Sequence, residues 1–524
     1  MRDGTTEPIP VIDVFAGPGG LGEGFSAYRY DDTHPFKIRL SVEKDKYAHS
    51  TLELRSFFRQ FPDNDKPADY YSFLRGEISR DELFSRHKKQ ASAAANEALQ
   101  AELGLSEDNA RIDALIEESL AGTDRWVLIG GPPCQAYSII GRARRSRDAA
   151  DSAYLPEDDV RSFLYLEYLR IIARYRPAVF VMENVKGMLS STIQGQRIFE
   201  HIISDLRTPS NVFPEYSGSA TQEYTVYSLV KRANKIGSGT ADELKPEDFI
   251  VECEKYGIPQ TRHRVILLGI RNDLSHVCPD ILEPCDDVTI DDVISEMPKL
   301  RSGLSREADS AEAWQQAITD ALDRRWLRGV RKKWGDELFE ELIETIIDLT
   351  LPANDRGSEY VRGSAPVIND LNWWYSDYML GGVCNHSARG HITKDVYRYL
   401  FAACFARYFE KSPKLRDFPP DLLPDHTNAK SGHFDDRFRV QVKGRPSTTI
   451  TSHISKDGHY YIHYDPSQAR SLTVREAARL QTFPDNYFFC GNRTQQYTQV
   501  GNAVPPLLAY KIAEIVNRII KQVF

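Results

Sequence analysis

A cysteine that could act as a nucleophile stands at position 134, behind Pro132 and Pro133 and after the apolar run 126–129. Two prolines stiffen the backbone at the end of what reads as a buried strand, and a polar segment follows. A thiol placed in this way is suited to covalent catalysis. Free cysteine is also among the most buried residue types, so an inert packed thiol explains the position equally well. The local sequence leaves both interpretations open.

A carboxylate and two arginines stand beside other apolar runs. Glu183 follows the run 177–182, where its carboxyl group could exchange a proton with a bound substrate. Arg262 and Arg264 precede the run 265–270 and alternate along an extended chain, so both could point at one anionic or carbonyl group. The three side chains are candidates for acid and electrostatic catalysis.

Two basic stretches could contact phosphate. Four arginines, at positions 142, 144, 145 and 147, follow the cysteine before any acidic residue, which favours a phosphate-bearing substrate over this loop. Residues 324–334 hold six basic residues, two tryptophans and no acid. Basic residues among aromatics are typical of a phosphate-contacting surface. A merely solvated loop and the charged outer face of an amphipathic helix remain the alternatives.

A glycine-rich loop follows the first apolar run, residues 10–15. Gly17, Gly19 and Gly20 stand between that strand and a helix start, as in loops that bind nucleotides. A second strand, predicted over 37–42, ends at Glu43, where a carboxylate commonly holds ribose hydroxyls. An exposed loop carboxylate is the plainer interpretation of Glu43. The pattern indicates an adenosine-type cofactor without separating a nicotinamide dinucleotide from S-adenosylmethionine.

The elements that would position these residues form an α/β pattern. Apolar strands alternate with helical segments up to residue 270, which predicts a parallel, doubly wound sheet with a helical insertion at about 61–123. Residues 271–443 break the alternation and contain five of the six tryptophans, which predicts a separate core. Two β segments are expected at 445–451 and 459–464, around a turn at 456–458. A capping box of Thr473 and Glu476 then begins a helix, and another helix ends the chain.

Composition limits the class of protein. The 524 residues are too many for one compact core. Seven cysteines without a Cys-x-x-Cys pair argue against disulfides and structural zinc, so no metal site is expected. No apolar signal segment or 18-residue apolar run occurs, so we expect a soluble intracellular protein. A net charge of -9 does not exclude nucleic acid, because phosphate binding depends on local patches.

The order of the motifs resembles that of the DNA (cytosine-5) methyltransferase family, in its bacterial form. The resemblance rests on six segments, at residues 13–20, 133–135, 183–185, 260–264, 472–481 and 501–504. It implies a Rossmann-like S-adenosylmethionine-dependent methyltransferase sheet with a separate target-recognition domain. The implied domains are a catalytic domain at 1–270, a recognition domain at 271–443, and a return to the catalytic domain at 444–524.

The resemblance also implies roles for single residues. Cys134 would add to C6 of a cytosine flipped out of duplex DNA, Glu183 would hold or protonate N3, and Arg262 and Arg264 would stabilise the ring carbonyl. Gly76, Glu77 and Ile78 would stand for the segment that contacts adenine. The implied S-adenosylmethionine-binding residues are Phe15, Ala16, Gly17, Gly19, Gly20, Glu43, Pro133, Leu164, Asn502 and Val504. Such an enzyme is expected to be a monomer in the bacterial cytoplasm, associated with the nucleoid.

Two alternatives remain: a tRNA cytosine-5 methyltransferase, and a catalytically inactive DNA-binding relative. The inactive relative would be expected to lack the cysteine, the carboxylate or the cofactor loop, and this chain has all three. A nicotinamide dehydrogenase would leave Cys134, Glu183 and the paired arginines without a role. An amino-methyltransferase would need an aromatic residue where Cys134 stands. Restriction-modification, phage defence and housekeeping methylation are equally compatible with the sequence.

Overall fold

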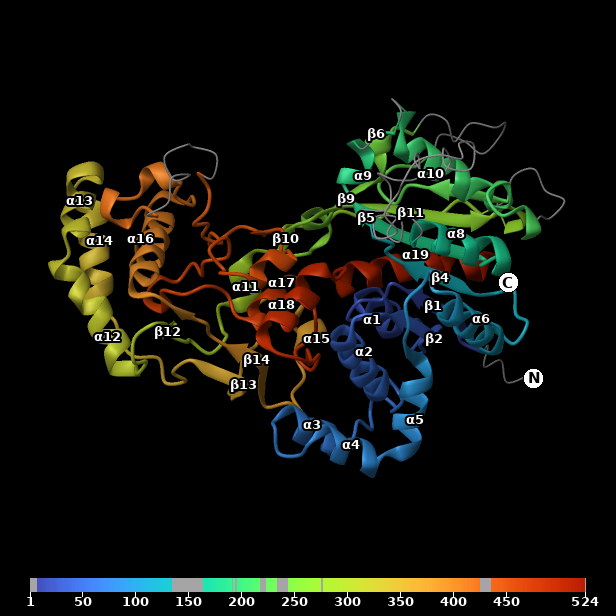
Figure 1. Cartoon of the computed structure of the whole chain (residues 1–524), viewed down its shortest axis with the longest axis horizontal. Coiled ribbons are helices and arrows are strands. Elements are labelled where there is room, and N and C mark those ends of the chain that lie inside the picture. Colours follow the sequence, from blue (N-terminus) through green and yellow to red (C-terminus); the bar gives the residue numbers. More distant parts are fainter. Residues whose placement is uncertain are drawn as a thin grey trace, which may run out of the picture.

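The structure is a computed structural model of the chain and describes residues 7–133, 164–190, 192–193, 196–216, 223–232, 244–274, 277–424 and 435–523. Its largest sheet has eight strands in the order β3-β2-β1-β4-β5-β11-β8, with β9 paired to β11 (Figure 1). In that order the strands are Ala98–Gln100, Phe36–Glu43, Ile9–Val14, Val127–Gly130, Val179–Val185, His263–Arg271 and Tyr224–Tyr227, with β9 at Ile250–Glu252. The strands predicted before the glycine loop and before the cysteine are therefore confirmed, as the neighbours β1 and β4.

The sheet is mixed. Strands β1 to β5 pair in parallel, whereas β11 pairs antiparallel with β5, β8 and β9. The expectation of a wholly parallel sheet up to residue 270 is wrong at this strand. An apolar run that is buried on both faces reads the same in either direction. No α-helix separates β9 from β11, and an antiparallel neighbour needs no crossover helix.

Helices cover both faces of this sheet, as a Rossmann-like fold requires. Leu21 and Phe25 of α1 share one apolar core with Val11 of β1 and with the C-terminal helix α19. On the opposite face, α6, α8 and α10 pack against Ile12 and Leu128. One of the helical segments expected between the apolar strands is α8. These helices are α1 (Gly20–Ala27), α6 (Ser106–Leu120), α8 (Leu164–Tyr175), α10 (Ile198–Arg207) and α19 (Pro506–Val523).

The C-terminal helix lies directly against α1. A Cβ atom built on Gly24 would stand 2.4 Å from the Cβ of Ala509 and 2.4 Å from the carbonyl oxygen of Pro506. About one helical turn earlier, a Cβ on Gly20 would stand 2.2 Å from the carbonyl oxygen of Val504. The expected return of the chain end to the first βα unit is therefore present, with α1 as the main contact of α19.

The predicted helical insertion contains a strand of the main sheet. Helices α3 (Ala68–Leu74), α4 (Arg80–Arg86) and α5 (Lys88–Glu97) follow α2 (Lys46–Arg59). Residues 98–100, expected to be helical, instead form β3 and pair with β2. Leu99 packs on the sheet together with Ile112 of α6. A three-residue strand inside an Ala-rich, Glu-rich segment carries too little β pattern to be recognised from the sequence.

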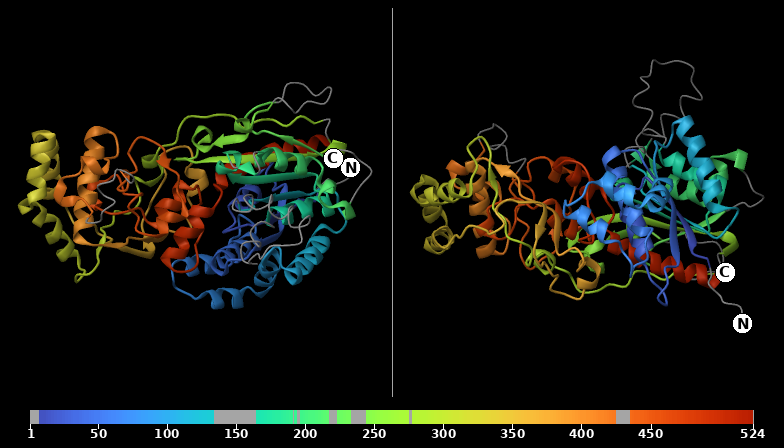
Figure 2. Two further views of the ribbon diagram at one scale, coloured as in Figure 1. Left: turned by 45° about the horizontal axis from the view of Figure 1, so that its top comes forward. Right: turned by 90° about the horizontal axis from the view of Figure 1, so that it is seen from below.

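A separate apolar core lies at the other end of the molecule. It is built mainly on α12 (Ala311–Thr319), α13 (Arg325–Trp334), α14 (Asp336–Ile347) and α16 (Thr393–Phe409). Figures 1 and 2 show these helices far from the sheet in every view. Trp314 and Trp326 lie in this core, but Trp374 packs against Tyr510 of α19 and donates to the carbonyl oxygen of Thr482 at 2.7 Å. The expectation that all five tryptophans share one core is therefore wrong.

The segment between the two cores differs from the predicted pair of β segments. Strand β16 (Ser447–Thr448) pairs in parallel with β10 (Gln260–Thr261). Residues 452–455 form a 3₁₀ helix, and Ile462 makes only isolated bridges, to Val440 and Ser471. The backbone at 447–448 pairs with the strand that leads to Arg262, and residues 459–464 reach this segment through the Tyr461 hydroxyl, which donates to the Thr449 carbonyl oxygen. The predicted capping box is confirmed, because Glu476 N–H donates to Thr473 Oγ1 and Thr473 N–H donates to the Glu476 carboxylate.

We expect Gly24→Ala to lower the free energy of unfolding by about 2 kcal/mol, because the added methyl group overlaps backbone and side-chain atoms of α19. Urea unfolding followed by circular dichroism measures the change. Gly329→Ala is the control, because it also lies in a helix but its Cβ would meet nothing closer than 3.7 Å. A cost at Gly24 no larger than at Gly329 would contradict the close packing.

Candidate active site

The glycine loop lies at the carboxyl end of β1 and has a backbone that requires glycine. Gly17 and Gly19 have φ angles of 57° and 95°, in the left-handed region, and Phe15 before them has a φ of 58°. A Cβ on Gly17 would meet nothing within 4 Å, so space is open beside the loop. The N-terminus of α1 at Gly19 has no side-chain cap. An uncapped helix start and open space suit the close approach of a ligand.

Glu43, the last residue of β2, holds this loop from the side. Its carboxylate accepts the Gly17 N–H at 2.8 Å and the Asp45 N–H at 2.7 Å. Burial raises the pKa of Glu43, and these backbone amides oppose the rise. Each carboxylate oxygen keeps acceptor capacity for a ligand hydroxyl. The glycine loop and Glu43 therefore lie in direct contact.

The other residues expected around a cofactor come from four parts of the chain. Ala16 is buried against Leu52 and Ala98, and Leu164 is buried at the start of α8. Val504 is buried with its carbonyl against Gly20, whereas Asn502 is exposed at the end of α18 (Arg493–Asn502). The loop and the segment 502–504 therefore meet.

The expected adenine-contacting segment is placed elsewhere. Glu77 pairs with Arg75, and Arg75 donates to the carbonyl oxygen of Met379, in the part of the molecule where α3 and α4 pack. Next to Glu43 the chain instead presents the end of β3, and Ala101 N–H donates to the Glu43 carbonyl oxygen at 3.2 Å. Residues 100–102 therefore border the loop. A contact of Gly76, Glu77 and Ile78 with adenine stays a prediction.

Glu183 lies in β5, the strand beyond β4, at the same edge of the sheet. A Cβ on Gly131 would stand 3.0 Å from its Oε2 atom, and the Pro132 carbonyl oxygen accepts the Asn184 side chain at 2.9 Å. Pro133 is exposed at the end of this turn. The next residue, Cys134, lies outside the described residues, as do Arg142, Arg144, Arg145 and Arg147. The structure thus positions the carboxylate beside the backbone that leads into the predicted nucleophile.

The two arginines have different surroundings. Arg264 forms an ion pair with Glu183, with Nε 2.9 Å from Oε1, and its Nη1 donates to the His263 carbonyl oxygen. Arg262 is 2% exposed and donates to the carbonyl oxygens of Ile450 and Ala503, both at 2.8 Å. Burial lowers the pKa of Arg262, and the charge of Arg264 acts in the same direction. Arg264 is therefore available to a substrate beside Glu183, whereas Arg262 joins three segments of backbone.

Gln260 and Gln481 extend the same junction. Gln260 Nε2 donates to the Leu480 carbonyl oxygen and to Gln481 Oε1, and Gln260 Oε1 accepts the Ile450 N–H. Gln481 Nε2 in turn donates to the carbonyl oxygen of Val500. These side chains are completely buried, so their hydrogen bonds are costly to lose. The junction connects the strand that carries Arg264 to the segment that covers the glycine loop.

A hollow of about 370 Å³ opens beside this junction. Thr261 lines it next to Arg262, and hydroxyl groups of further threonines and tyrosines converge there with Arg439 and His453. Such a set of hydroxyl and cationic donors suits phosphate or the polar edge of a base. The sequence signal that could have located it is the threonine run at 448–451.

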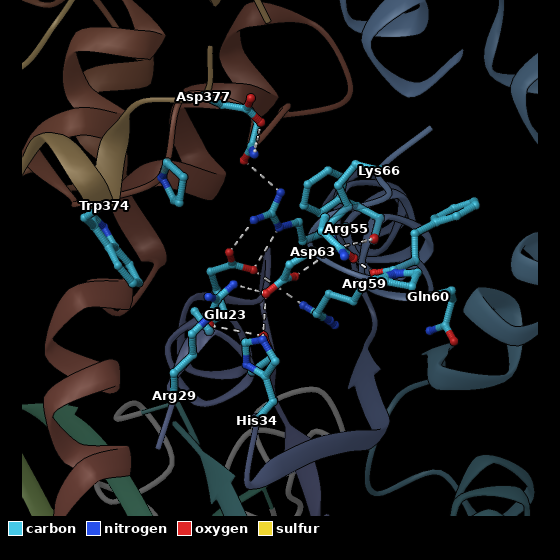
Figure 3. A pocket seen from close by; sticks show the side chains of 18 of the residues that line it. Glu23, Arg29, His34, Arg55, Arg59, Gln60, Asp63, Lys66, Trp374 and Asp377 are labelled. Atoms are coloured by element: carbon cyan, nitrogen blue, oxygen red, sulfur yellow. Dashed lines mark hydrogen bonds and ion pairs between the residues drawn. The ribbon is translucent and has the colours of Figure 1, made fainter. Parts of the chain in front are cut away.

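A larger hollow, of about 1280 Å³, lies away from these residues (Figure 3). It borders Pro8 and Phe36, at the amino ends of β1 and β2, and so faces the opposite edge of the sheet. Inside it, Glu23 of α1 receives two hydrogen bonds from Arg55 of α2 (Figure 3). Burial raises the pKa of Glu23, but Arg55 and Arg59 outweigh it and hold the value below the usual range. These pairs fix α1, and with it the glycine loop, against α2.

The second basic stretch forms α13, at the far end of the molecule from the sheet (Figure 1). Arg331 pairs with Asp336, and Arg325 is 4.0 Å from Asp421. Trp326 faces the core, so this helix has the amphipathic form given as the alternative. A phosphate contact at its basic face stays a prediction.

Within the described ranges, no group of His, Cys, Asp and Glu has a metal-binding arrangement. The six cysteines in those ranges are free thiols. No helix in the same residues is long and apolar enough to cross a membrane.

Known proteins resemble the whole chain. The sequence model of a family described as C-5 cytosine-specific DNA methylase matches residues 88–209 and 245–518. Type II methyltransferase M.Bpa9945I of Bacillus paralicheniformis is 32% identical over 97% of this chain and 99% of its own length. Type II methyltransferase M.AgeI of Thalassovita gelatinovora is 26% identical over 97% of this chain and 99% of its own. DNA (cytosine-5-)-methyltransferase M.ApeKI of Aeropyrum pernix is 27% identical over 77% of this chain and 83% of its own.

The contrast between the two arginines predicts different costs of substitution. Arg262→Met removes the donor of the buried Ile450 carbonyl oxygen and the shorter of two donors to the Ala503 carbonyl oxygen, so we expect it to lower the free energy of unfolding by about 3 kcal/mol. Arg264→Met removes one ion pair and one main-chain hydrogen bond at the edge of the site, so it should cost less than Arg262→Met. Urea unfolding of both variants measures the difference. Equal costs would contradict the distinct positions of the two side chains.

Proposed function

This chain belongs to the C-5 cytosine-specific DNA methylase family and is a methyltransferase, and from that premise we propose that it methylates C5 of a cytosine flipped out of duplex DNA. One observation carries the proposal most directly. The glycine loop, Glu43, the Pro132 and Pro133 turn and Glu183 all lie at the carboxyl ends of neighbouring parallel strands. Ligands of open α/β sheets bind at this edge.

The site suits S-adenosylmethionine, the methyl donor of such enzymes. Open space beside Gly17, the uncapped start of α1 and the Glu43 carboxylate provide room, amide donors and an acceptor for ribose hydroxyls. Phe15, Ala16, Leu164 and Val504 would supply the apolar walls, and Gly19, Gly20, Pro133 and Asn502 the backbone and rim. When bound, this cofactor supplies an electrophilic methyl group. The role of the residues around the site is to orient the cofactor and to exclude water from it.

Cysteine chemistry explains why the family needs a thiolate. Cytosine C5 is a poor nucleophile, but addition of the Cys134 sulfur to C6 moves the electrons of the C5–C6 double bond onto C5. Carbon C5 can then take the methyl group. Removal of the C5 proton by a base restores the double bond, and the C6–S bond breaks to release the thiolate.

Glu183 and Arg264 would accept the charge that this addition creates. Glu183 would donate a proton or hydrogen bond to N3, and Arg264, already against the Glu183 carboxylate, would bind the ring carbonyl. Arg262 would act through position, because its donors are engaged by backbone carbonyls. Arg262 would hold the strand that carries Arg264 in place against the backbone segment that covers the cofactor loop.

We propose that the distant helical core is the target-recognition region. Duplex DNA would lie between this core and the sheet. Arg439 and the threonines of the smaller hollow, at the junction of the two, would bind nucleotides next to the target cytosine. Full-length similarity to two proteins named as type II methyltransferases supports a role in a bacterial modification system. We propose that the enzyme acts as a monomer on specific sites.

The covalent step predicts a trapped complex. DNA that contains 5-fluorocytosine in the target site has no C5 proton to remove, so the Cys134–C6 adduct should persist and survive denaturing electrophoresis. Cys134→Ser should reduce the adduct at least about 100-fold. Cys278→Ser is the matched control, because Cys278 is an exposed free thiol that should not react with the base.

Active wild-type protein that forms no adduct, or a Cys134→Ser variant that forms it normally, would contradict the mechanism. The same assay with fluorinated tRNA separates the alternative substrate. An adduct with tRNA and none with DNA would replace the DNA proposal by a tRNA methyltransferase.

A further inference from the structure

Asp13 is a buried carboxyl group that the proposed chemistry does not use. It is the fifth residue of β1, and its side chain is completely buried. Its neighbours across the sheet are Ser41 of β2 and Ile129 of β4. Asp13 therefore lies inside the sheet, two residues before Phe15 and the start of the cofactor loop.

The carboxyl group of Asp13 lies under the first turn of α1. A Cβ built on Gly22 would stand 3.0 Å from Asp13 Oδ2, so only a residue without a side chain leaves room for the acid. Gly22 is two residues beyond Gly20, where α1 begins. Any shift of the Asp13 side chain would therefore be transmitted to the turn that carries the cofactor loop.

Neither oxygen of Asp13 accepts a well-formed hydrogen bond from a described residue, although the Gly22 amide lies close enough to lower its pKa, and the neighbouring Ser41 hydroxyl has no partner either. A buried carboxylate without a partner loses its hydration energy and gains nothing in return. A protonated carboxyl group avoids that cost. It also offers an O–H donor that the Ser41 hydroxyl or the backbone of the turn can accept.

The charges around Asp13 do not remove this cost. Burial raises the pKa of Asp13, Arg59 of α2 and the Gly22 amide oppose the rise, Glu43 on β2 adds to it, and the resulting pKa is about 8. Arg59 is already engaged, since its Nη2 donates to Glu97 at 2.6 Å and its Nη1 lies 3.7 Å from Glu23 in the larger hollow (Figure 3). On α8, the Tyr168 hydroxyl donates to the Val181 carbonyl oxygen, and Asp13 raises its pKa. At neutral pH the uncharged acid is therefore the main form.

We propose that Asp13 is a positioning residue for the cofactor loop and that it works as an uncharged carboxylic acid. The inference rests on the proposed function, because it concerns the S-adenosylmethionine site. Glu43 holds Gly17 from one side with its own carboxylate. An ionised Asp13 would repel Glu43, which holds Gly17, and would have to shift to regain solvation or a partner, so the loop above it would be displaced. Cofactor affinity should therefore be constant while Asp13 is protonated and should fall as Asp13 ionises.

The replacement Asp13→Asn tests this role, because asparagine keeps the shape and a donor but cannot ionise. The dissociation constant for S-adenosylmethionine is measured by calorimetry from about pH 6.5 to about pH 9.5. At pH 7 the variant should bind within about threefold of wild type. Above pH 8 the wild type should lose affinity relative to the variant by up to about tenfold per pH unit.

Asp113→Asn is the matched control. Asp113 is also a buried aspartate, but both of its oxygens accept from Arg170 at 2.9 Å. This variant should lower the melting temperature and leave the pH profile of cofactor binding unchanged. Asp13→Asn should leave the melting temperature at pH 7 nearly unchanged.

Three results would overturn the inference: an Asp13→Asn protein that does not fold, one that binds more than about tenfold more weakly at pH 7, or one whose affinity follows the same pH profile as wild type. Wild-type protein that binds no S-adenosylmethionine at any pH would instead refute the proposed function. The two failures are therefore distinguishable.

Discussion

The carbonyl oxygen of Val504 lies where a side chain at position 20 would have to be, and much of the structure depends on this contact. It brings the end of the chain onto the loop that follows the first strand. Gly24 allows α19 to continue the approach, and Arg262 anchors the same segment through the Ala503 carbonyl oxygen. The cofactor loop is therefore complete only when the C-terminal segment has returned, so folding of the sheet and formation of the site are coupled.

Most of the charged side chains near the loop have a hydrogen-bond or ion-pair partner. Glu43 is held by backbone amides, Glu23 by Arg55, and Glu183 by Arg264. Asp13 has no such partner, and its burial favours the neutral form. The cofactor would be cationic, and the target cytosine would gain charge during the reaction. Both would enter a site where the Glu183 carboxylate already has the Arg264 guanidinium 2.9 Å away. Preorganised charge of this kind lowers the cost of the reaction because little has to reorient.

Strong local patterns made much of this architecture predictable. Apolar runs followed by glycines or prolines located β1 and β4, apolar runs that end at Glu43 and Glu183 located β2 and β5, and the Thr473 capping box located a helix start. The antiparallel direction of β11 was not predictable, because a run buried on both faces carries no sign of direction. The short strand β3, the pairing of β16 with β10 and the place of Trp374 depend on contacts between distant segments. Among the site residues, the separate roles of Arg262 and Arg264 depend on carbonyl groups from residues 450 and 503, which spacing alone does not reveal.

The product of the proposed reaction is 5-methylcytosine at a defined sequence of duplex DNA. Expression in a host without cytosine methylation, followed by conversion sequencing of the genome, measures it directly. We predict one recurring sequence motif methylated at C5 with the wild-type protein and none with Cys134→Ser. A genome that stays unmodified while the wild-type protein is folded and abundant would contradict it.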